Sequence, residues 1–242
     1  MPTGRCLIIS CEHGGFEVPA DYAAAFAGQQ PLLLSHRGWD PGALQLARQM
    51  ADAFGAPLYA STTTRLLIDL NRSMGHRQLF SAATRGLSKA DREKIVVRHY
   101  RPHRDAVESE IARRIGVGEQ VIHIASHSFT PVLDGVVRRA DVAWLYDPQR
   151  AGESALSRRW LAQLTQRAPG LKLRRNYPYQ GRGDGLTSLL RRRFSGEAYV
   201  GIELEVNQRF VIQGGDAWAA LRSDLVGSLA AALPAKPVQR LR

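Results

Sequence analysis

Polar side chains that could do chemistry stand at or near the ends of four apolar runs in this sequence. In order along the chain, the runs and their polar residues are Cys6–Cys11 with Glu12 and His13, 65–70 with Asn71 and Arg72, 121–125 with His127, and 199–206 with Glu203 and Glu205. Short apolar runs of this kind are typical of strands buried on both faces of a sheet. If the strands are parallel, their polar ends converge on one edge, where open α/β folds bind ligands.

These residue types together indicate one kind of chemistry. Two histidines and a carboxylate with one open position make a catalytic zinc site. A further carboxylate can act as the general base that takes a proton from water. An arginine offers a planar fork that matches a substrate carboxylate. The set therefore predicts metal-assisted hydrolysis of an amide in a substrate that carries a carboxylate.

The turn after the first apolar run contains two consecutive glycines, Gly14 and Gly15. Glycine allows a sharp turn, so we expect this backbone to come close to a ligand. The plain alternative is a turn that leads into a helix and leaves His13 as a surface histidine.

Length and composition limit the classes of protein to which this chain can belong. Its 242 residues suffice for one large α/β domain or two small ones. No apolar run reaches the roughly 18 residues that a membrane span needs, and the first residues lack a signal-peptide pattern. We therefore expect a cytoplasmic protein with no membrane partner. Cys6 and Cys11 lie on opposite faces of one predicted strand, which fits a reduced compartment.

The net charge of +11 raises the question of a nucleic-acid partner. Arginine is spread along the chain, and its densest runs are 174–175 and 191–193. No aromatic residues interleave with these runs, as a platform for stacked bases requires. We therefore expect a solvated basic face or a small anionic substrate, and no nucleic-acid partner.

Apolar periodicity predicts strands in alternation with helices. The predicted strands are 6–11, 58–61, 65–70, 121–125, 141–146, 171–174 and 199–206, and the predicted helices are 22–26, 42–54, 89–115, 151–168, 186–194 and 216–233. This order predicts a single α/β domain over 1–242, with a mixed, mostly parallel sheet flanked by helices.

Individual residues mark the ends of these elements. Asp40 and Pro41 are typical of the N-cap and first turn of helix 42–54. Ser88 begins a sequence close to a capping box. Pro102 lies within the long predicted helix and predicts a kink or a break there. The tail 234–242 has no predicted element and is expected to be loose.

Six segments, taken in order, resemble the motifs of a known family. They are CEHGG, WDPGA, RLLIDLNR, HSFTP, NYPYQGRGDG and ELEVNQ. This ordered set is similar to that of the N-formylglutamate amidohydrolase family, over residue 6 to about residue 210. The family's fold is similar to that of zinc carboxypeptidases and aspartoacylase-like deacylases. The resemblance implies a zinc-dependent amidohydrolase that releases formate from N-formyl-L-glutamate, or a relative that acts on a similar N-acyl amino acid.

The resemblance also implies the ligands of a zinc ion, Zn²⁺. His13 and His127 match the family's histidines, and Asp40 belongs to a shared motif, so these three are the expected metal ligands. The alternative for Asp40 is a plain helix N-cap. Glu17 is another candidate carboxylate, although it stands one residue too far from His13 for the carboxypeptidase spacing. Glu12 is a third candidate carboxylate, but it is more naturally a residue that supports a metal ligand than a ligand itself.

Roles in substrate binding and catalysis follow from the same resemblance. Asn71 and Arg72 look like the pair that holds a substrate carboxylate in carboxypeptidase-like enzymes. Arg65 is expected to bind an anion or polarise a carbonyl group, with a surface salt bridge as its alternative. Glu205 is the expected general base, and Glu203, on the same face of the strand, is the alternative.

Three further expectations complete the sequence-based picture. His123 is expected to be a packed core histidine. Loop 176–185 is expected to cover the site, either as a mobile lid or as an ordinary long loop. The substrate is expected to be a small N-acyl amino acid; N-acetyl, N-succinyl or peptide substrates and a non-hydrolytic anion-binding protein remain as alternatives.

Overall fold

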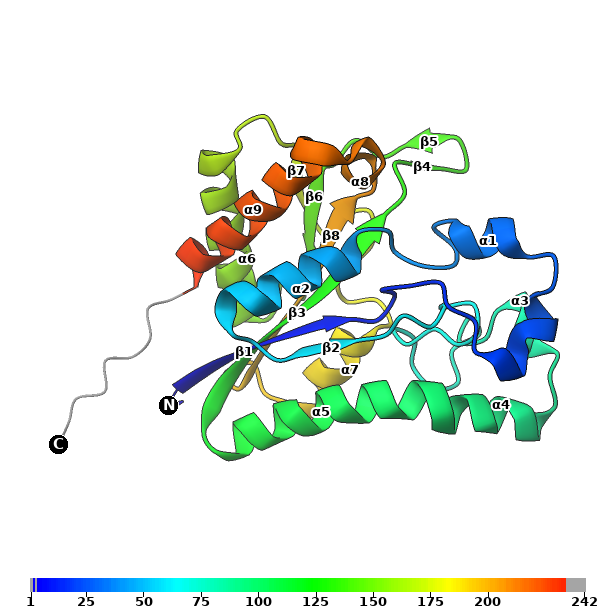
Figure 1. Cartoon of the computed structure of the whole chain (residues 1–242). Helices are drawn as coiled ribbons and strands as arrows, with labels where there is room; N and C mark the ends of the chain where they lie inside the picture. The colour runs from blue at the N-terminus through cyan, green and yellow to red at the C-terminus, as the bar shows by residue number, and fades with distance from the viewer. Residues whose placement is uncertain (1, 3, 234–242) are drawn as a thin grey trace.

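A mixed six-stranded sheet forms the centre of the computed structural model, which describes residue 2 and residues 4–233 (Figure 1). The strands lie in the order β2-β1-β3-β8-β6-β7. They are β1 (Gly4–Cys11), β2 (Leu58–Ala60), β3 (Glu119–Phe129), β6 (Val142–Leu145), β7 (Leu173–Arg175) and β8 (Tyr199–Asn207). A separate hairpin contains β4 (Val132–Leu133) and β5 (Val136–Val137). The predicted α/β fold with a mixed, mostly parallel sheet is confirmed.

Helices cover both faces of this sheet. The helical segments are η1 (Ala20–Phe26), α1 (Gln30–Leu34), α2 (Ala43–Phe54), α3 (Ala82–Arg85), α4 (Lys89–Ile95), η2 (Val96–Tyr100), α5 (Arg101–Gly116), α6 (Ala151–Arg167), α7 (Leu186–Arg193), α8 (Arg209–Gln213) and α9 (Gly215–Ala232). Apolar residues of α2, α6 and α9 pack on one face, and those of α5 and α7 pack on the other (Figure 1). Cys11 packs in the core on the face covered by α2, α6 and α9, and Cys6 packs on the face covered by α5 and α7. Both cysteines are free, as predicted.

The directions of the strands decide where their ends meet. Strands β2, β1, β3 and β8 are parallel, so their carboxyl ends lie at one edge of the sheet. Strand β6 runs antiparallel to β8, and β7 is parallel to β6. The edge formed by the ends of β1, β3 and β8 is therefore the place where the predicted chemical residues gather.

Residues 65–70 do not form the predicted strand. Their backbone follows a series of turns, in which the Leu67 N–H donates to the Thr64 carbonyl and the Arg72 N–H donates to the Asp69 carbonyl. The apolar side chains of this segment pack with Ile95 and Val96 in a separate core cluster. A short apolar run is buried in either case, so periodicity alone misassigned its backbone.

The helix that contains Pro102 does not break at that residue. A π-helical turn, η2, connects α4 to α5, and the two helices continue as one rod (Figure 1). The proline lies in the first turn of α5, where a missing backbone N–H is tolerated. Ser88 caps α4 as predicted, because its Oγ accepts from the Asp91 N–H at 3.1 Å. The predicted loose tail, 234–242, lies outside the described residues.

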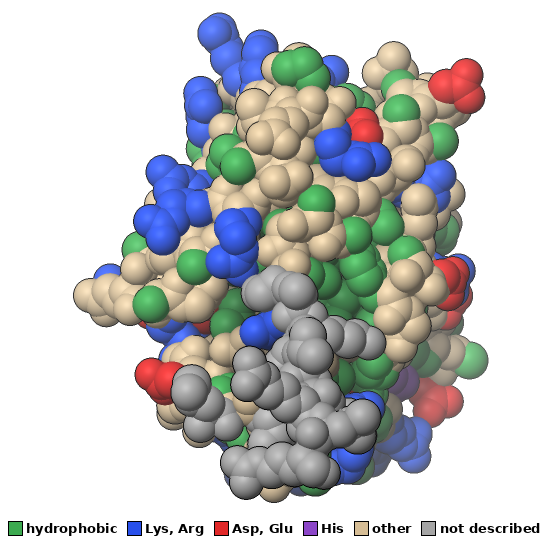
Figure 2. All heavy atoms as spheres, turned by 90° about the vertical axis from the view of Figure 1, so that its left-hand side faces the viewer, with side chains coloured by type: hydrophobic (Ala, Val, Ile, Leu, Met, Phe, Trp, Pro, Cys, Tyr) green, Lys and Arg blue, Asp and Glu red, His purple; other side chains and the backbone are tan. Residues whose placement is uncertain are grey.

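Basic side chains are scattered over the face of the molecule drawn in Figure 2, in several separate groups. Within the described part of the chain, no helix has both the length and the apolar character required to cross a membrane.

Candidate metal and catalytic site

The predicted site residues from three strand ends and two loops line one pocket of about 290 Å³. Those that line it are His13, Asp40, Arg65, Asn71, Arg72, His127, Glu203 and Glu205. His13 follows β1, His127 lies near the end of β3, and Glu205 is the register partner of His127 on β8. The parallel arrangement of these strands therefore brings together residues that are far apart in the sequence.

Backbone and hydroxyl contacts place Asp40 between the two histidines. The Asp40 N–H donates to the His13 carbonyl at 2.9 Å. On the other side, the hydroxyls of Ser126 and Ser128 on β3 donate to carbonyls at the start of α2, at 2.9 and 2.8 Å. Asp40 is not a helix cap, because Gly42 occupies that position and no side chain caps the helix. The N-cap prediction is therefore wrong, and the carboxylate is free to face the histidines.

His13, Asp40 and His127 form a candidate metal-binding group. One ligand atom from each lies within 4.8 Å of the other two. Asp40 Oδ2 is 2.9 Å from His127 Nδ1 and 3.4 Å from His13 Nδ1. All three side chains are buried, so the group offers two imidazole nitrogens and a carboxylate oxygen in the combination that zinc prefers.

The outer nitrogens of both imidazoles face carboxylates. His13 Nε2 donates to Asp69 Oδ1 at 2.7 Å, and His127 Nε2 lies 3.0 Å from Glu12 Oε2. An ionised carboxylate only accepts hydrogen bonds, so Asp69 holds a proton at Nε2 of His13 and leaves the Nδ1 lone pair of that ring for a cation. Burial alone would lower the pKa of His127, but Asp40 and Glu12 raise it well above its ordinary range. This concentration of negative charge fits a bound cation.

The two alternative carboxylate ligands lie elsewhere. Glu12 is fully buried behind His127, and its Oε1 is 3.3 Å from Nε2 of His103 on α5. Glu17 accepts from the Thr62 hydroxyl at 2.6 Å and is not part of the three-residue group. Among the described residues, the geometry thus favours Asp40 as the carboxylate ligand and gives Glu12 a supporting position.

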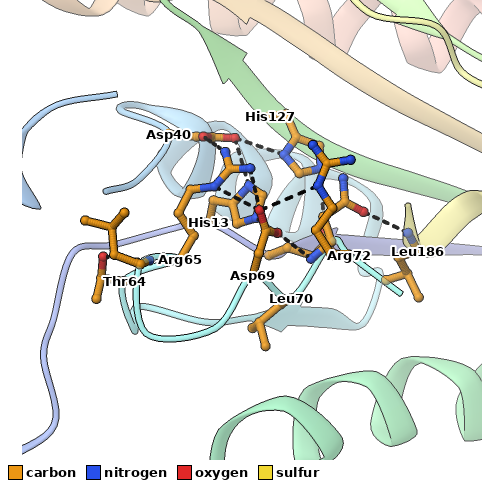
Figure 3. Close-up of polar contacts among 12 residues, drawn as sticks. His13, Asp40, Thr64, Arg65, Asp69, Leu70, Arg72, His127 and Leu186 are labelled. Atoms are coloured by element: carbon orange, nitrogen blue, oxygen red, sulfur yellow. Dashed lines mark hydrogen bonds and ion pairs between the residues drawn. The ribbon is translucent and has the colours of Figure 1, made fainter. Parts of the chain in front are cut away.

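Asp69 connects the candidate metal-binding group to the segment that contains Asn71 and Arg72 (Figure 3). Besides His13, its carboxylate accepts from Arg65 Nη2 at 2.7 Å and from the Asn71 N–H at 3.0 Å. Arg65 Nη1 donates to Asp40 Oδ1 at 3.3 Å, so its guanidinium bridges Asp40 and Asp69. Burial alone would raise the pKa of Asp69, but Arg65 and His13 hold it well below its usual range. Arg65 thus lies in the pocket with its donors directed at these carboxylates.

Asn71 and Arg72 also line the pocket, beside the loop that precedes α7, and Arg72 Nε lies 3.9 Å from Asp69 Oδ2. Asn71 Oδ1 accepts from the Leu186 N–H at 2.8 Å, which leaves the Nδ2 donor for a ligand. Arg72 Nη1 donates to the Asp184 carbonyl at 3.3 Å, and about a third of its side chain is exposed. Space is tight at Gly185, because a Cβ atom there would lie 3.0 Å from Glu203 Oε1 and 3.2 Å from Asn71 Oδ1, so these side chains would have to shift to admit it.

The two glutamates of β8 have different surroundings. Glu203 Oε1 accepts from the Thr187 hydroxyl at 2.5 Å. Glu205 Oε2 is buried and has no hydrogen-bond partner. Burial raises the pKa of Glu205 to about 8. A carboxyl group with a raised pKa and an unpaired oxygen in a pocket is suited to proton transfer.

The glycines of the first turn pack closely against the backbone that follows β2. A Cβ atom on Gly15 would lie 2.5 Å from the Thr62 carbonyl oxygen, and one on Gly14 would lie 2.9 Å from that of Ser61. These glycines therefore allow close packing against the backbone after β2, which fixes the position of His13. Loop 176–185 supplies one wall of the pocket, through Tyr179, Gln180, Gly183 and Asp184.

Sequence reasoning missed Asp69 and His103. Asp69 is the one charged residue inside the run LLIDL, and a carboxylate in an apolar run was the available signal. His103 lies on the predicted helix 89–115 and has no such signal. His123 is a core residue as expected, because its two ring nitrogens contact Ser10 Oγ and Tyr199 Oη at 2.8 Å each.

Comparisons with known proteins agree with this arrangement. The family model for N-formylglutamate amidohydrolase matches residues 5–212. A gene product of Agrobacterium tumefaciens is 28% identical, with a TM-score of 0.81 over 96% of this chain and 91% of that one. The N-formylglutamate amidohydrolase of Ralstonia eutropha is 19% identical and has a similar fold, with a TM-score of 0.65 over 96% of this chain and 95% of that one. A search of curated proteins finds no match. Because the family model matches most of this chain, the chain belongs to the N-formylglutamate amidohydrolase family.

Proposed function

We propose that this protein is a zinc-dependent amidohydrolase that cleaves the formyl amide of N-formyl-L-glutamate or a closely similar N-acyl amino acid. One observation carries the proposal. Nδ1 of His13 and Nδ1 of His127 face Asp40 Oδ2, at 3.4 and 2.9 Å, in the same pocket as the unpaired oxygen of Glu205. A metal ligand group beside an available base is the arrangement that metal-assisted hydrolysis requires.

The residues of the chain divide the work of the reaction. His13, Asp40 and His127 would hold the zinc ion, which supplies a Lewis acid for the attacking water and the amide carbonyl. The Glu205 carboxylate takes a proton from that water and transfers it to the amide nitrogen as the C–N bond breaks. The products are then formate and an amino acid with a free amino group.

Asn71 and Arg72, which line the same pocket, bind the substrate's main carboxylate. The Arg72 guanidinium offers a charged fork, and Asn71 Nδ2 offers a further donor. Arg65 keeps Asp40 and Asp69 in position through its hydrogen bonds of 3.3 and 2.7 Å. The non-hydrolytic alternative has no observation in its favour, because simple anion binding does not need the buried Glu205.

A direct assay tests the proposed function. The purified protein is stripped of metal with a chelator, and formate release from N-formyl-L-glutamate is measured before and after zinc is added. We expect activity only after zinc is restored, and less activity on N-acetyl- and N-succinyl-L-glutamate. Full activity in the chelator, or none on any of the three substrates with zinc present, would contradict the proposal.

A further inference from the structure

Arg138 is a buried cation beside the pocket that pairs with no carboxylate in the described part of the chain. Its side chain and backbone are together only 9% exposed. Its N–H donates to the Pro131 carbonyl at 2.8 Å, and its own carbonyl accepts from Asn207 Nδ2 at 3.1 Å, so the backbone is fixed to the end of β8. A buried charge is costly without a counter-charge, which suggests that an anion from outside the chain completes the site.

The side-chain contacts of Arg138 lead to Tyr179 in the pocket wall. The guanidinium carbon lies 5.2 Å from the centre of the Tyr179 ring, and Nη1 donates to Tyr179 Oη at 3.2 Å. A guanidinium can only donate, so the phenol oxygen accepts and its own proton is free to be donated. Tyr179 lines the pocket and is 48% exposed. The pair therefore offers an O–H donor supported by a positive charge.

His36 extends the same positive wall. It lines the pocket, and burial, followed by the charges of Arg37 and Arg138, lowers its pKa. Arg65 carries the other nearby positive charge, but its donors are directed at Asp40 and Asp69. Arg138 thus lies behind the pocket-lining Tyr179 and pairs with no carboxylate among the described residues, whereas Arg72 Nε lies 3.9 Å from Asp69 Oδ2.

We infer that Tyr179 and Arg138 form a second anion-binding subsite, which takes a carboxylate on the side chain of the substrate's amino acid. The inference rests on the proposed function, in which Asn71 and Arg72 bind the main carboxylate. Tyr179 and Arg138 would then set the preference for an acidic side chain over an uncharged one in the N-acyl amino acid.

Paired substrates that differ only in side-chain charge test this subsite. We compare kcat/KM for N-formyl-L-glutamate and N-formyl-L-glutamine in the zinc-loaded wild-type protein and in the variants Arg138→Met and Tyr179→Phe. We expect the wild type to prefer the glutamate substrate by about tenfold or more, as for a charged hydrogen bond. Arg138→Met should remove most of that preference and change kcat/KM for the glutamine substrate by less than about threefold.

The control variant is Arg182→Gln. Arg182 belongs to the same loop, is 60% exposed in its side chain and lies 3.7 Å from Asp147, so its replacement should leave the preference intact. Tyr179→Phe should reduce the preference, because the donated proton is lost. Equal losses on both substrates in Arg138→Met, or an unchanged preference, would overturn the subsite.

Binding without turnover separates this inference from the proposed function. Calorimetry with the Glu205→Gln protein, with and without Arg138→Met, measures the affinities for the same two compounds. A preference for N-formyl-L-glutamate that Arg138→Met removes supports the subsite even if the wild type releases no formate. Formate release by the wild type with no charge preference in either measurement would overturn the subsite and leave the proposed function standing. No binding of either compound would overturn the subsite.

Discussion

Glu205 and Glu203 stand two residues apart on β8 and both line the pocket, but their carboxylates have different contacts. Glu203 is engaged by the Thr187 hydroxyl at 2.5 Å, whereas Glu205 Oε2 has no partner. We expect Glu205→Gln to lower kcat by about a hundredfold or more with zinc content unchanged, since it removes the proton acceptor. Glu203→Gln should reduce kcat only a few-fold, because it weakens the contact with Thr187 on α7 and leaves the proposed base in place. A larger loss of kcat in Glu203→Gln than in Glu205→Gln would transfer the role of the base to Glu203.

The raised pKa of Glu205 also predicts how the stability of the metal-free protein depends on pH. The folded pKa of about 8 lies above the ordinary value of 4.5, so folding favours the protonated form. Its stabilising contribution is complete below pH 4.5 and is lost as the pH rises through 8. Relative to Glu205→Gln, the wild type should therefore lose up to about 1.4 kcal/mol of unfolding free energy per pH unit in this window.

Urea unfolding at pH 5 and pH 8 in the presence of a chelator measures this effect. Glu93→Gln is a suitable control, because Glu93 is 60% exposed in its side chain on α4. If the difference in unfolding free energy between the wild type and Glu205→Gln is the same at both pH values, Glu205 is not held protonated in the folded metal-free protein.

Asp69 links His13, a proposed metal ligand, to Asn71, a proposed substrate-binding residue. Replacing Asp69 by Asn removes the negative charge that His13, Arg65 and Asn71 share. We expect the zinc Kd to rise about 10- to 100-fold, as is usual when the partner of a metal-bound histidine is lost. KM should also rise, because the backbone of Asn71 loses its acceptor. The exposed Asp52→Asn variant is the control, and equal zinc affinity in the two variants would contradict this role.

The start of α7 is the element on which the substrate-binding side of the pocket depends. The Leu186 N–H bonds to Asn71, and a Cβ atom on Gly185 would lie only 3.0 Å from Glu203 Oε1. Gly185→Ala should therefore displace the start of α7 and destabilise the protein by about 1–3 kcal/mol, with a higher KM. Gly170→Ala, at a position with no atom within 4 Å, should do neither, and equal thermal stability of the two variants would contradict the prediction.

Elements with a strong apolar pattern were predictable from the sequence. Strands β1, β3 and β8 and helices α2, α6 and α9 agree with the predicted ranges within a few residues. The backbone of segment 65–70 was not predictable from its apolar pattern, because its apolar side chains are buried in a segment of turns rather than in a sheet. Asp69 was missed for the same reason, since a residue assigned to a strand interior was not considered as a partner of His13.

At the scale of the whole molecule, the sheet determines the site by bringing strand ends together. The alternation of strands and helices predicted the shared edge, and hence the meeting of His13, His127 and Glu205. The antiparallel direction of β6 was not predictable, because it depends on pairing with β8 rather than on any pattern within residues 142–145. The contact between Tyr179 and Arg138 likewise joins two distant loops, which no local spacing in the sequence records.

The position of the metal tests the central claim most directly. Crystals of the zinc-loaded protein, measured at the zinc absorption edge, give the place of the ion by anomalous scattering. We predict one zinc site per chain, about 2.0–2.2 Å from Nδ1 of His13, Nδ1 of His127 and an oxygen of Asp40. Zinc coordinated through the Nε2 atoms, zinc held elsewhere with these three side chains free, or no bound zinc would contradict the account.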